Sequence, residues 1–449
     1  MSTSHASAPR SFSAKVGIDD LRSFLAIFDG LRTKERRARV WGERQAMVTL
    51  MTLCEPGTSR SYRDACELTH ATLGQALGWK RVPAASGLVS VRQKLGKSKP
   101  SKGVLKRIWS AAMTWADARL ARVPEALPGW RLIAVDGMGM IMPRSASCSA
   151  AYQIRRDKSG NELSHYPEAR LVSAWDVERR LPLAWKTSSA QAKGGERRQT
   201  VDLLSELPER SMLLCDRGLP SREMFAEILA EGHGFVMRMP AGGTWPEIKQ
   251  FIASNADDAI VQVRLGKPAS SPTTPLRLVR RSFDRGRPQS GQSRDRMVIL
   301  TTLTDPLITA EQIIALYQKR WTIETIHNEL KTHIGIEDWH STTKAGIDQE
   351  ILVRMLWHLL IGHISSHLEA DAIAKDPAST KRANTKRVMS SIARAVTYIF
   401  DAAAENGTVR TWLLARARAA IESAQRQMVN RRHRKSKPRI ALHPYARPR

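Results

Sequence analysis

The spacing of hydrophobic and polar residues divides the first half of the chain into a helical segment and a strand-containing one. Between residue 17 and about 125, apolar residues recur at helical intervals in IDDLRSFLAIF, RQAMVTLMTLC and LKRIWSAAMTWADARL. From about 130 to 240, short apolar runs ended by turn residues predict strands in RLIAVDG, RLVSAWD and MLLCDRG, and SREMFAEILAEG predicts an amphipathic helix. Strands mixed with helices are typical of an α/β core.

The second half of the chain changes pattern twice. Strand-like runs AIVQVRL, LRLVRRSF and RMVILTTL fall within residues 241–305 and predict a mostly β insertion. Helices then resume with ITAEQIIALYQKRWTIETIHNELKTHIG and EILVRMLWHLLIGHISSHL, and continue to about residue 425. The final segment, RRHRKSKPRIALHPYARPR, is a basic tail that we expect to be disordered when free.

Net charge indicates the kind of partner. The 449 residues include 71 Lys and Arg against 43 Asp and Glu, a formal charge of +28. Nucleic acid is the first candidate, because each phosphate that is neutralised releases condensed counterions. The alternatives are a chain kept soluble by its charge, or one bound to an anionic membrane surface. We expect no membrane segment, since no apolar run reaches the roughly 18 residues that a spanning helix needs.

The basic residues crowd between the apolar stripes of the first segment, from Arg32 to Arg39 and at Arg44. Their density predicts a helical DNA-binding domain at residues 1–125, with solvated helix faces as the alternative. The other expected units are an α/β core in two parts, 126–240 and 306–375, the β-rich insertion at 241–305, and a helical C-terminal region with a basic tail at 376–449.

Cysteine spacing and the first residues of the chain bear on location. Cys54, Cys66, Cys148 and Cys215 show no C-x-x-C pairing, so neither a zinc knuckle nor a disulfide framework is predicted. The start of the chain, MSTSHASAPRSFSAKV, has no apolar signal-peptide core. We therefore expect a reducing cytoplasm.

Four polar side chains share one strip of a predicted helix. Tyr317, Arg320, Glu324 and Lys331 lie at offsets of 0, 3, 7 and 14, which on a continuous α-helix fall within a sector of about 60°. The strip borders an apolar stripe on the same helix, so its side chains would lie at the edge of the core, where residues that line a cleft are found. The simpler alternative is an ordinary ion pair between Arg320 and Glu324, which would stabilise the helix by about 0.3–0.5 kcal/mol, beside a tyrosine at the edge of the core.

Two aspartates follow apolar runs that predict buried strands. Asp136 comes after Leu-Ile-Ala-Val, and Asp216 after Met-Leu-Leu-Cys. At the carboxyl ends of neighbouring strands they would project into one crevice, although aspartates in turns are the alternative for each. Together with Glu324 they would repel one another unless a cation lay between them, and such oxygen ligands suit Mg²⁺ or Mn²⁺. Two such ions can clamp the oxygens of an in-line phosphoryl displacement.

These residues resemble a known family. YQKRWTIETIHNELK is similar to the Tyr-x2-Arg-x3-Glu-x6-Lys (YREK) signature of DDE transposases from bacterial insertion sequences, and HYPEARLV and LTTLTD also look like family phrases. The resemblance covers about residues 50 to 370. It implies a ribonuclease H-like core in which Asp136 ends the first strand, Asp216 ends the fourth, and Glu324 comes from a helix after the insertion.

The resemblance also implies roles. Tyr317, Arg320 and Lys331 would contact phosphates of the transposon end, and the chain would act as a dimer assembled on double-stranded DNA. The expected reaction cuts the transposon end to leave a 3′-OH, which attacks target DNA without a covalent protein intermediate. The rivals are a ribonuclease H-like nuclease that cuts without joining, and a non-catalytic DNA-binding derivative of a transposase.

Four aromatic residues near these positions have less definite roles. Trp321 and Trp245 could stack on an unpaired base, although Trp321 more simply packs beside the helix. His327 stands where the family often has Phe, and His333 lies two residues after Lys331. For both histidines a neutral residue at the surface or in the cleft is the simpler interpretation, so neither is counted as a metal ligand.

Overall fold

The computed structural model describes residues 13–31, 40–75, 77–95, 103–121, 123–192, 194–240, 245–254, 256–265, 273–283, 295–379, 381–404, 407–426 and 428–430. The predicted basic run from Arg32 to Arg39 and the basic tail from residue 431 lie outside these residues.

Nine strands of the described chain form one mixed sheet, in the order β2-β3-β1-β5-β6-β9-β8-β7, with β4 paired to β3. The strands are β1 (Arg131–Ile141), β2 (Ile154–Arg156), β3 (Glu162–Asp176), β4 (Leu181–Ser189), β5 (Ser211–Cys215), β6 (Gly234–Arg238), β7 (Asp258–Arg264), β8 (Thr273–Phe283) and β9 (Asp295–Thr301). Strands β1, β5 and β6 run parallel and form its centre.

Alternation along β1 divides the core between the two faces of the sheet. Leu132 and Ala134 belong to one buried cluster and Ile133 and Val135 to another, as the two-residue period of a strand requires. The first cluster includes residues of α12 (Lys344–Lys375), α5 (Val104–Asp117) and α11 (Thr322–Glu329). The second includes residues of α7 (Gly195–Leu203), α8 (Arg222–Ala230) and α9 (Pro246–Ala253). Helices therefore cover both faces.

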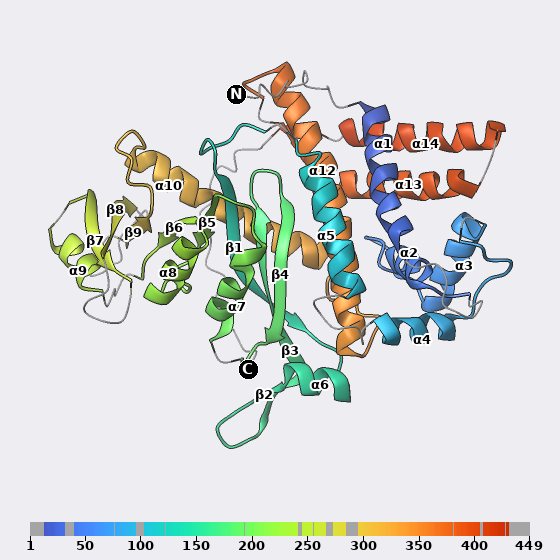
Figure 1. Cartoon of the computed structure of the whole chain (residues 1–449), viewed down its shortest axis with the longest axis horizontal. Coiled ribbons are helices and arrows are strands. Elements are labelled where there is room, and N and C mark those ends of the chain that lie inside the picture. The colour runs from blue at the N-terminus through green and yellow to red at the C-terminus, as the bar shows by residue number, and fades with distance from the viewer. Residues whose placement is uncertain are drawn as a thin grey trace, which may run out of the picture.

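The predicted insertion does not form a separate body. Its strands β7, β8 and β9 extend the central sheet, because β9 pairs with β6 in antiparallel orientation and β8 with β9. Figure 1 shows this extension and α9 at one end of the molecule. The chain therefore returns from the insertion along the central sheet before it enters the signature helices.

Helices from both ends of the chain pack together beyond the sheet. They are α1 (Ala14–Leu25), η1 (Ala26–Gly30), α2 (Glu43–Leu53), α3 (Tyr62–Leu73), α4 (Ala85–Leu95), α13 (Thr385–Ala404) and α14 (Gly407–Gln425). Helix α1 contacts α14, and α3 contacts α13, while α12 contacts α2, α4 and α5. The short strands β10 (Lys381–Ala383) and β11 (Met428–Asn430) pair antiparallel near the end of the described chain.

Helix α12 lies at the centre of this arrangement and contacts both the sheet and the other helices. By length and composition it could cross a membrane, but 94% of the apolar window lies inside the protein. It packs between the sheet and the helices of the first segment, and Trp357 on it donates a hydrogen bond to the Met51 carbonyl of α2. The hydrophobicity of α12 is thus explained by burial in a core.

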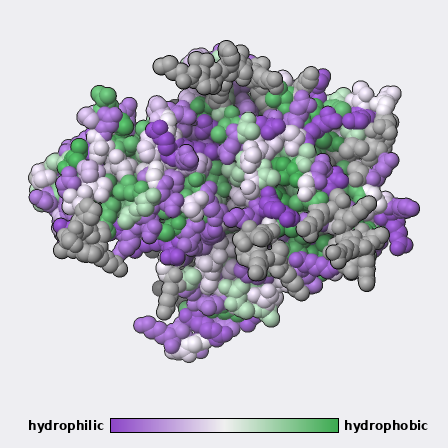
Figure 2. Space-filling model, in the orientation of Figure 1, coloured by the Kyte–Doolittle hydropathy of each residue, from purple (hydrophilic) through white to green (hydrophobic). Residues whose placement is uncertain are grey.

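A hairpin projects from the body beyond β1. Strands β2 and β3 form it, with α6 (Ala146–Tyr152) beside its base, and its tip is hydrophilic (Figures 1 and 2). Arg155, Arg156 and Lys158 are exposed there. The last residue of β1, Ile141, pairs with Glu168 of β3 near the base of this hairpin. The hairpin therefore projects from the edge of the sheet at which the parallel strands β1 and β5 have their carboxyl ends.

Candidate active site

Asp136 lies in β1, and Asp216 directly follows the adjacent parallel strand β5. Residues Arg131 to Ala134 of β1 pair with Ser211 to Leu214 of β5. Continued by two residues, the same register places Asp136 beside Asp216, which follows the last residue of β5. The side-by-side placement predicted from the two apolar runs is therefore present at the edge where the pairing of β1 with β5 ends.

One detail of that prediction is wrong. Asp136 does not end its strand, because β1 continues to Ile141 through antiparallel pairing with β3. Asp216 directly follows β5, which is the fourth strand in chain order when the three-residue hairpin strand β2 is set aside. The continuous buried run stops at residue 135, and the buried residues Met138 and Met140 then alternate with more exposed ones, while hydrogen bonding to β3 carries the strand further.

The signature segment is not one continuous α-helix. Its parts are α10 (Ala310–Gln318), a 3-10 turn η4 (Lys319–Trp321), α11, and a π-helical turn η5 (Leu330–Ile334). A 3-10 turn winds more tightly than an α-helix and a π turn less tightly, so the single-helix wheel does not describe the strip. Contacts, rather than the wheel, therefore show which residues of the strip lie together.

Arg320 links three members of the strip. Its Nη2 donates a hydrogen bond to Glu324 Oε1 at 3.0 Å, and its guanidinium lies 5.9 Å from the centre of the Tyr317 ring. Arg320 is 5% exposed and Tyr317 is 4% exposed, whereas the Glu324 side chain is 46% exposed. The ordinary Arg320–Glu324 ion pair is thus present, but Arg320 is buried close to the two aspartates and does not lie on a solvated helix face.

The surroundings of Asp136 strongly affect its ionisation. Burial raises its pKa to about 6, with smaller contributions in the same direction from Glu196 and Asp216. A hydrogen bond from the Gly137 amide to Oδ1, 2.9 Å long, and the charge of Arg320 act in the opposite sense. A buried carboxyl that ionises reluctantly, with other acids close by, is the kind of group that a cation stabilises in its charged form.

The donor set fits a divalent ion of the Mg²⁺ class. Asp136, Asp216 and Glu324 offer only carboxylate oxygens, which such ions prefer. Within the described residues the three carboxylates are not all within 4.8 Å of one another, in keeping with their mutual repulsion and with the hold of Arg320 on Glu324. Closure of the set around an ion would therefore involve movement of the half-exposed Glu324 side chain.

Lys331 reaches the strand that carries Asp136. Its Nζ donates a hydrogen bond to the Gly139 carbonyl of β1 at 2.8 Å and lies 3.7 Å from Glu337 Oε2. Lys331 also lines a cavity of about 300 Å³, whose other polar side chains include the base Arg354 and the acids Glu55 and Asp338. All four signature side chains thus lie on or beside the strands that bear the aspartates.

The less definite aromatic residues fall in different environments. Trp321 does not pack into the core: it is 56% exposed, with the Arg320 guanidinium 5.1 Å from its ring centre. Trp245 packs against Phe225, with ring centres 5.6 Å apart, and under Arg222. Of the two tryptophans, Trp321 has the more exposed indole.

Both histidines lie at partly buried positions. His327 contacts Ser173 Oγ through Nε2 at 3.2 Å, and burial lowers its pKa to about 4. It is therefore neutral at physiological pH, as expected for a cleft residue. His333 lines the cavity next to Lys331.

Sequence reasoning missed one acid in this region, Glu196. It lies in the first turn of α7 and forms an ion pair with Arg170 of β3 at 3.3 Å, and its Oε1 lies 2.5 Å from the point where a Cβ at residue 137 would stand. The signal available in the sequence was Gly194-Gly195-Glu196, a pair of glycines that precedes an acid at a helix start. Nothing local indicated that this helix start would contact β1.

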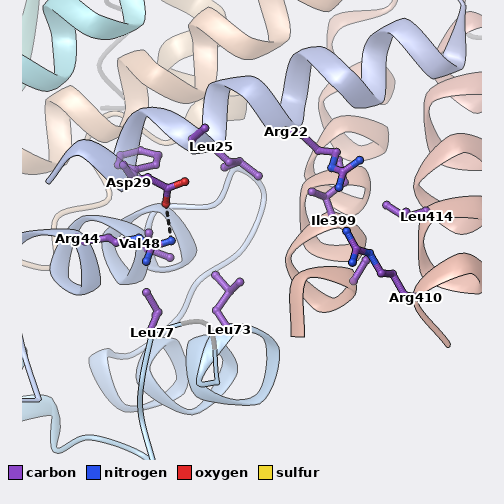
Figure 3. A pocket seen from close by; sticks show the side chains of 13 residues that line it. Arg22, Leu25, Asp29, Arg44, Val48, Leu73, Leu77, Ile399, Arg410 and Leu414 are labelled. Carbon is purple, nitrogen blue, oxygen red and sulfur yellow. Dashed lines mark ion pairs between the residues drawn. The ribbon is translucent and has the colours of Figure 1, made fainter. Parts of the chain in front are cut away.

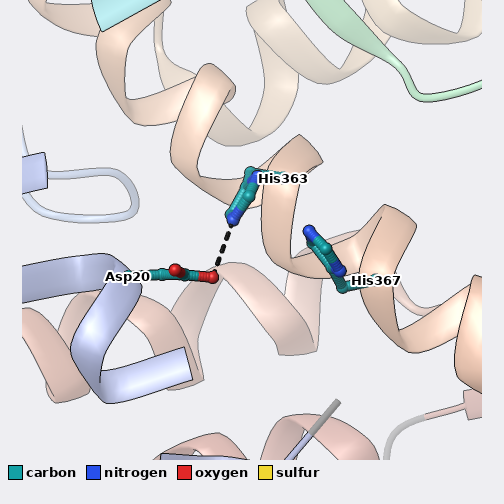
Figure 4. A group of neighbouring side chains, drawn as sticks. All are labelled: Asp20, His363 and His367. Carbon is teal, nitrogen blue, oxygen red and sulfur yellow. Dashed lines mark hydrogen bonds and ion pairs between the residues drawn. The ribbon is translucent and has the colours of Figure 1, made fainter. Parts of the chain in front are cut away.

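Two other clusters of side chains have ligand atoms close enough together to hold a metal ion, but members of each cluster already have protein partners. Asp20 Oδ2 lies 3.1 Å from His363 Nε2, and His367 is beside them, with ligand atoms within 4.8 Å (Figure 4). Asp20 Oδ1, however, lies 3.4 Å from Arg119 Nε, so this cluster joins α1 to α12. In the second group, of Cys54, His340 and Glu350, two buried arginines surround the glutamate.

The helical part contains a separate cavity of about 290 Å³. It lies among α1, η1, α2 and the C-terminal helices, with Arg22, Arg410 and the Asp29–Arg44 ion pair around apolar side chains such as Leu25 and Ile399 (Figure 3). Its lining includes none of the triad. We therefore place the chemistry at the sheet edge rather than in this cavity.

The comparisons with known proteins identify the family. A family model described as a transposase DDE domain matches residues 127–360, more than half of the chain. No curated protein shows a significant match. The matched residues run from just before β1 into α12, so they include both aspartates, the sheet extension and the signature helices. The central sheet with helices on both faces is accordingly a ribonuclease H-like core, and the chain belongs to the family of transposases with a DDE domain.

Proposed function

We propose that this transposase cuts the ends of an insertion sequence and joins the resulting 3′-OH to target DNA, with Asp136, Asp216 and Glu324 as its catalytic carboxylates. The register that sets Asp136 level with Asp216 is the observation that carries the proposal. Glu324 enters from α11, which packs against β1, so the third carboxylate comes from the helix that faces the two aspartates.

The three carboxylates would hold Mg²⁺ or Mn²⁺, and two ions fit the reaction class best. When bound, such ions stabilise the attacking and leaving oxygens of a phosphodiester displacement. Asp136 and Asp216 are carried by paired strands and supply a rigid side of the site. Arg320 orients Glu324 through the 3.0 Å hydrogen bond and, because it is buried, holds a positive charge close to the acids. Buried Tyr317 lies beside the guanidinium and restricts its movement.

Basic groups around the site supply contacts for double-stranded DNA. Lys331 contacts β1, and the exposed cations of the β2–β3 hairpin extend from the same edge of the sheet. Exposed Trp321 offers a face on which a base could stack. Tyr317 and Arg320 are buried in the DNA-free protein, so we assign them to positioning of Glu324 and expect phosphate contact only if DNA rearranges this segment.

A strand-transfer assay with pre-cut transposon ends tests the proposal. Asp136→Asn, Asp216→Asn and Glu324→Gln should each lower cleavage and joining by at least about 100-fold, because each removes a cation ligand, while DNA binding persists. Asp202→Asn is the matched control, since Asp202 is an exposed acid of α7 paired with Arg198. Equal activity of the triad variants and the control would exclude this catalytic site.

The same assay separates the rival functions. A nuclease would hydrolyse the ends and yield no joined product, whereas a non-catalytic derivative would bind DNA and leave it intact. We further propose that the active species is a dimer on DNA, located in the cytoplasm with the nucleoid. The mass of the complex with transposon-end DNA should then correspond to two chains, and a mass of one chain would contradict the dimer.

A further inference from the structure

The carboxylate of Glu196 lies in space that a side chain at residue 137 would otherwise fill. An ideal Cβ at that residue would stand 2.5 Å from Oε1 and 2.8 Å from Cδ of Glu196. Because real Cβ atoms do not approach oxygen that closely, the contact depends on Gly137 being glycine. Gly137 directly follows Asp136, so the extra acid contacts the backbone next to a proposed cation ligand.

Local chain geometry delivers Glu196 to this point. Gly194 and Gly195 have φ of +80° and +47°, a left-handed conformation that suits glycine, and α7 starts at the second of them. Arg197, which follows Glu196, donates hydrogen bonds from Nε and Nη2 to the Gly218 carbonyl at 3.2 and 3.1 Å. The first turn of α7 therefore contacts the backbone just after Asp136 and the loop just after Asp216.

The carboxylates of Asp136 and Glu196 flank the same peptide unit. Successive residues of β1 face opposite sides of the sheet, so Glu196 approaches Gly137 on the side of α7. Asp136 Oδ1, however, accepts a hydrogen bond from the Gly137 amide at 2.9 Å, which keeps that carboxylate along the same backbone. The charge of Glu196 is felt at Asp136, where it opposes ionisation.

A purely structural ion pair does not account for this arrangement. Arg170 and Glu196 are about one-third exposed, so their mutual attraction stabilises the fold little. The same carboxylate adds negative charge beside Asp136 and Asp216, which is unfavourable in the cation-free protein. A divalent ion at the aspartates reverses the sign of that effect, because the extra negative charge then attracts the ion.

We propose that Glu196 is a fourth carboxylate of the cation site, a positioning residue that acts through water on the bound ion and raises the affinity of the site for divalent cations. This inference rests on the proposed function of Asp136, Asp216 and Glu324. Arg170 holds Glu196 in place, and Gly137 leaves room for its carboxylate.

Binding of Mn²⁺ to the full-length protein without DNA tests the inference independently of activity. The probe is Mn²⁺ alone, and the free ion is measured by electron paramagnetic resonance. Glu196→Gln should weaken Mn²⁺ binding by about 10-fold or more, the scale on which groups around metal ligands act. Glu196→Asp, which keeps the charge, should recover part of the affinity, and Asp202→Asn on the same helix should bind as the unmodified chain does.

Gly137→Ala is the second variant, because its added methyl group displaces the Glu196 carboxylate while every charge stays. It should weaken Mn²⁺ binding in the unmodified chain but have little further effect in the Glu196→Gln chain, as coupled neighbours in a double-mutant cycle do. Circular dichroism establishes that each variant is folded. If Glu196→Gln fails to fold, Gly137→Ala and Glu196→Asp decide the question.

The outcomes for this inference and for the proposed function are distinct. If Glu196→Gln and Gly137→Ala bind Mn²⁺ as Asp202→Asn does, while Asp136→Asn loses binding, the role of Glu196 is overturned and the triad stands. If Asp136→Asn also binds Mn²⁺ normally, the proposed cation site itself is wrong.

Discussion

At the residue scale, the carboxyl group of Asp136 couples the stability of the protein to pH. Its pKa is raised to about 6 in the folded chain, above the ordinary value of 3.8, mainly by burial. The folded state therefore binds this proton more tightly than the unfolded state does. The contribution of this carboxyl group to the free energy of unfolding is therefore lost as pH rises from about 4 to 6, and little further loss occurs above pH 6.

Asp136→Asn should consequently stabilise the cation-free protein at pH 7.5, because a neutral amide replaces a buried charge. We expect a gain of about 3 kcal/mol in the free energy of unfolding, which shrinks towards zero near pH 4. Urea unfolding in the presence of EDTA at both pH values measures it. A gain of equal size at the two pH values would contradict the assignment, and added Mg²⁺ should stabilise only the unmodified chain.

Individual residues of the site differed in how far the sequence predicted them. The Arg320–Glu324 pair was predictable because its partners are four residues apart on one helix, where spacing determines contact. The Asp136–Asp216 placement followed from two apolar runs that end alike. Glu196 could not be predicted, because its contact with Gly137 depends on how α7 packs against a strand almost 60 residues earlier in the chain.

At the scale of elements, a buried ion network joins α4 to α12. Arg92 Nη2 donates to Glu350 Oε1 at 2.7 Å and Arg354 Nη1 to Oε2 at 3.4 Å, and all three side chains are at most 4% exposed. Burial alone would raise the pKa of Glu350, but a hydrogen bond from His340 and the two arginine charges lower it to about 2. The network therefore stabilises the fold above pH 4.5.

Glu350→Gln should destabilise the protein by about 3 kcal/mol at pH 7, because it leaves two buried arginines without their counter-charge. The difference from the unmodified chain should diminish as pH falls from 4.5 towards 2, where Glu350 becomes protonated. Asp348→Asn is the control on the same helix, since Asp348 forms a partly exposed pair with Lys344 and should change stability by less than about 1 kcal/mol. Urea midpoints of the two variants that coincide at pH 7 would contradict this role for the network.

Elements with strong periodicity were predicted well, and pairings between distant elements were not. The apolar runs of β1, β5 and β7 to β9 and the amphipathic pattern of α8 indicated those elements. The 3-10 and π turns within the signature segment were missed, because side-chain spacing does not report local winding. The union of β9 with β6 was also missed, since strand pairing is a non-local property that periodicity does not encode.

At the scale of the whole molecule, the positive charge determines how binding depends on salt. Each cation that contacts a phosphate of duplex DNA contributes about 0.9 to the slope of log K against log salt. The β2–β3 hairpin projects beyond the site with Arg155 and Lys158 exposed. We therefore expect the double variant Arg155→Gln, Lys158→Gln to weaken binding of transposon-end DNA and to reduce the slope by about 2.

The charge-preserving swap Arg155→Lys, Lys158→Arg is the matched control, and its slope should stay unchanged. Filter binding or fluorescence anisotropy across a salt series measures both variants. A slope that is the same for the glutamine variant and the swap would place the hairpin outside the DNA interface.

The pairing of β9 with β6 has a consequence for how this protein tolerates change in length. Strand β9 is hydrogen-bonded to the central sheet, and α10 follows it closely in the chain, so the position of Glu324 relative to the aspartates is set by that ladder. Strand β7 lies at the outer edge of the sheet and pairs only with β8 among the described strands. The outer hairpin is thus an exchangeable module that relatives or engineers could shorten, enlarge or replace, provided that β9 keeps its register with β6.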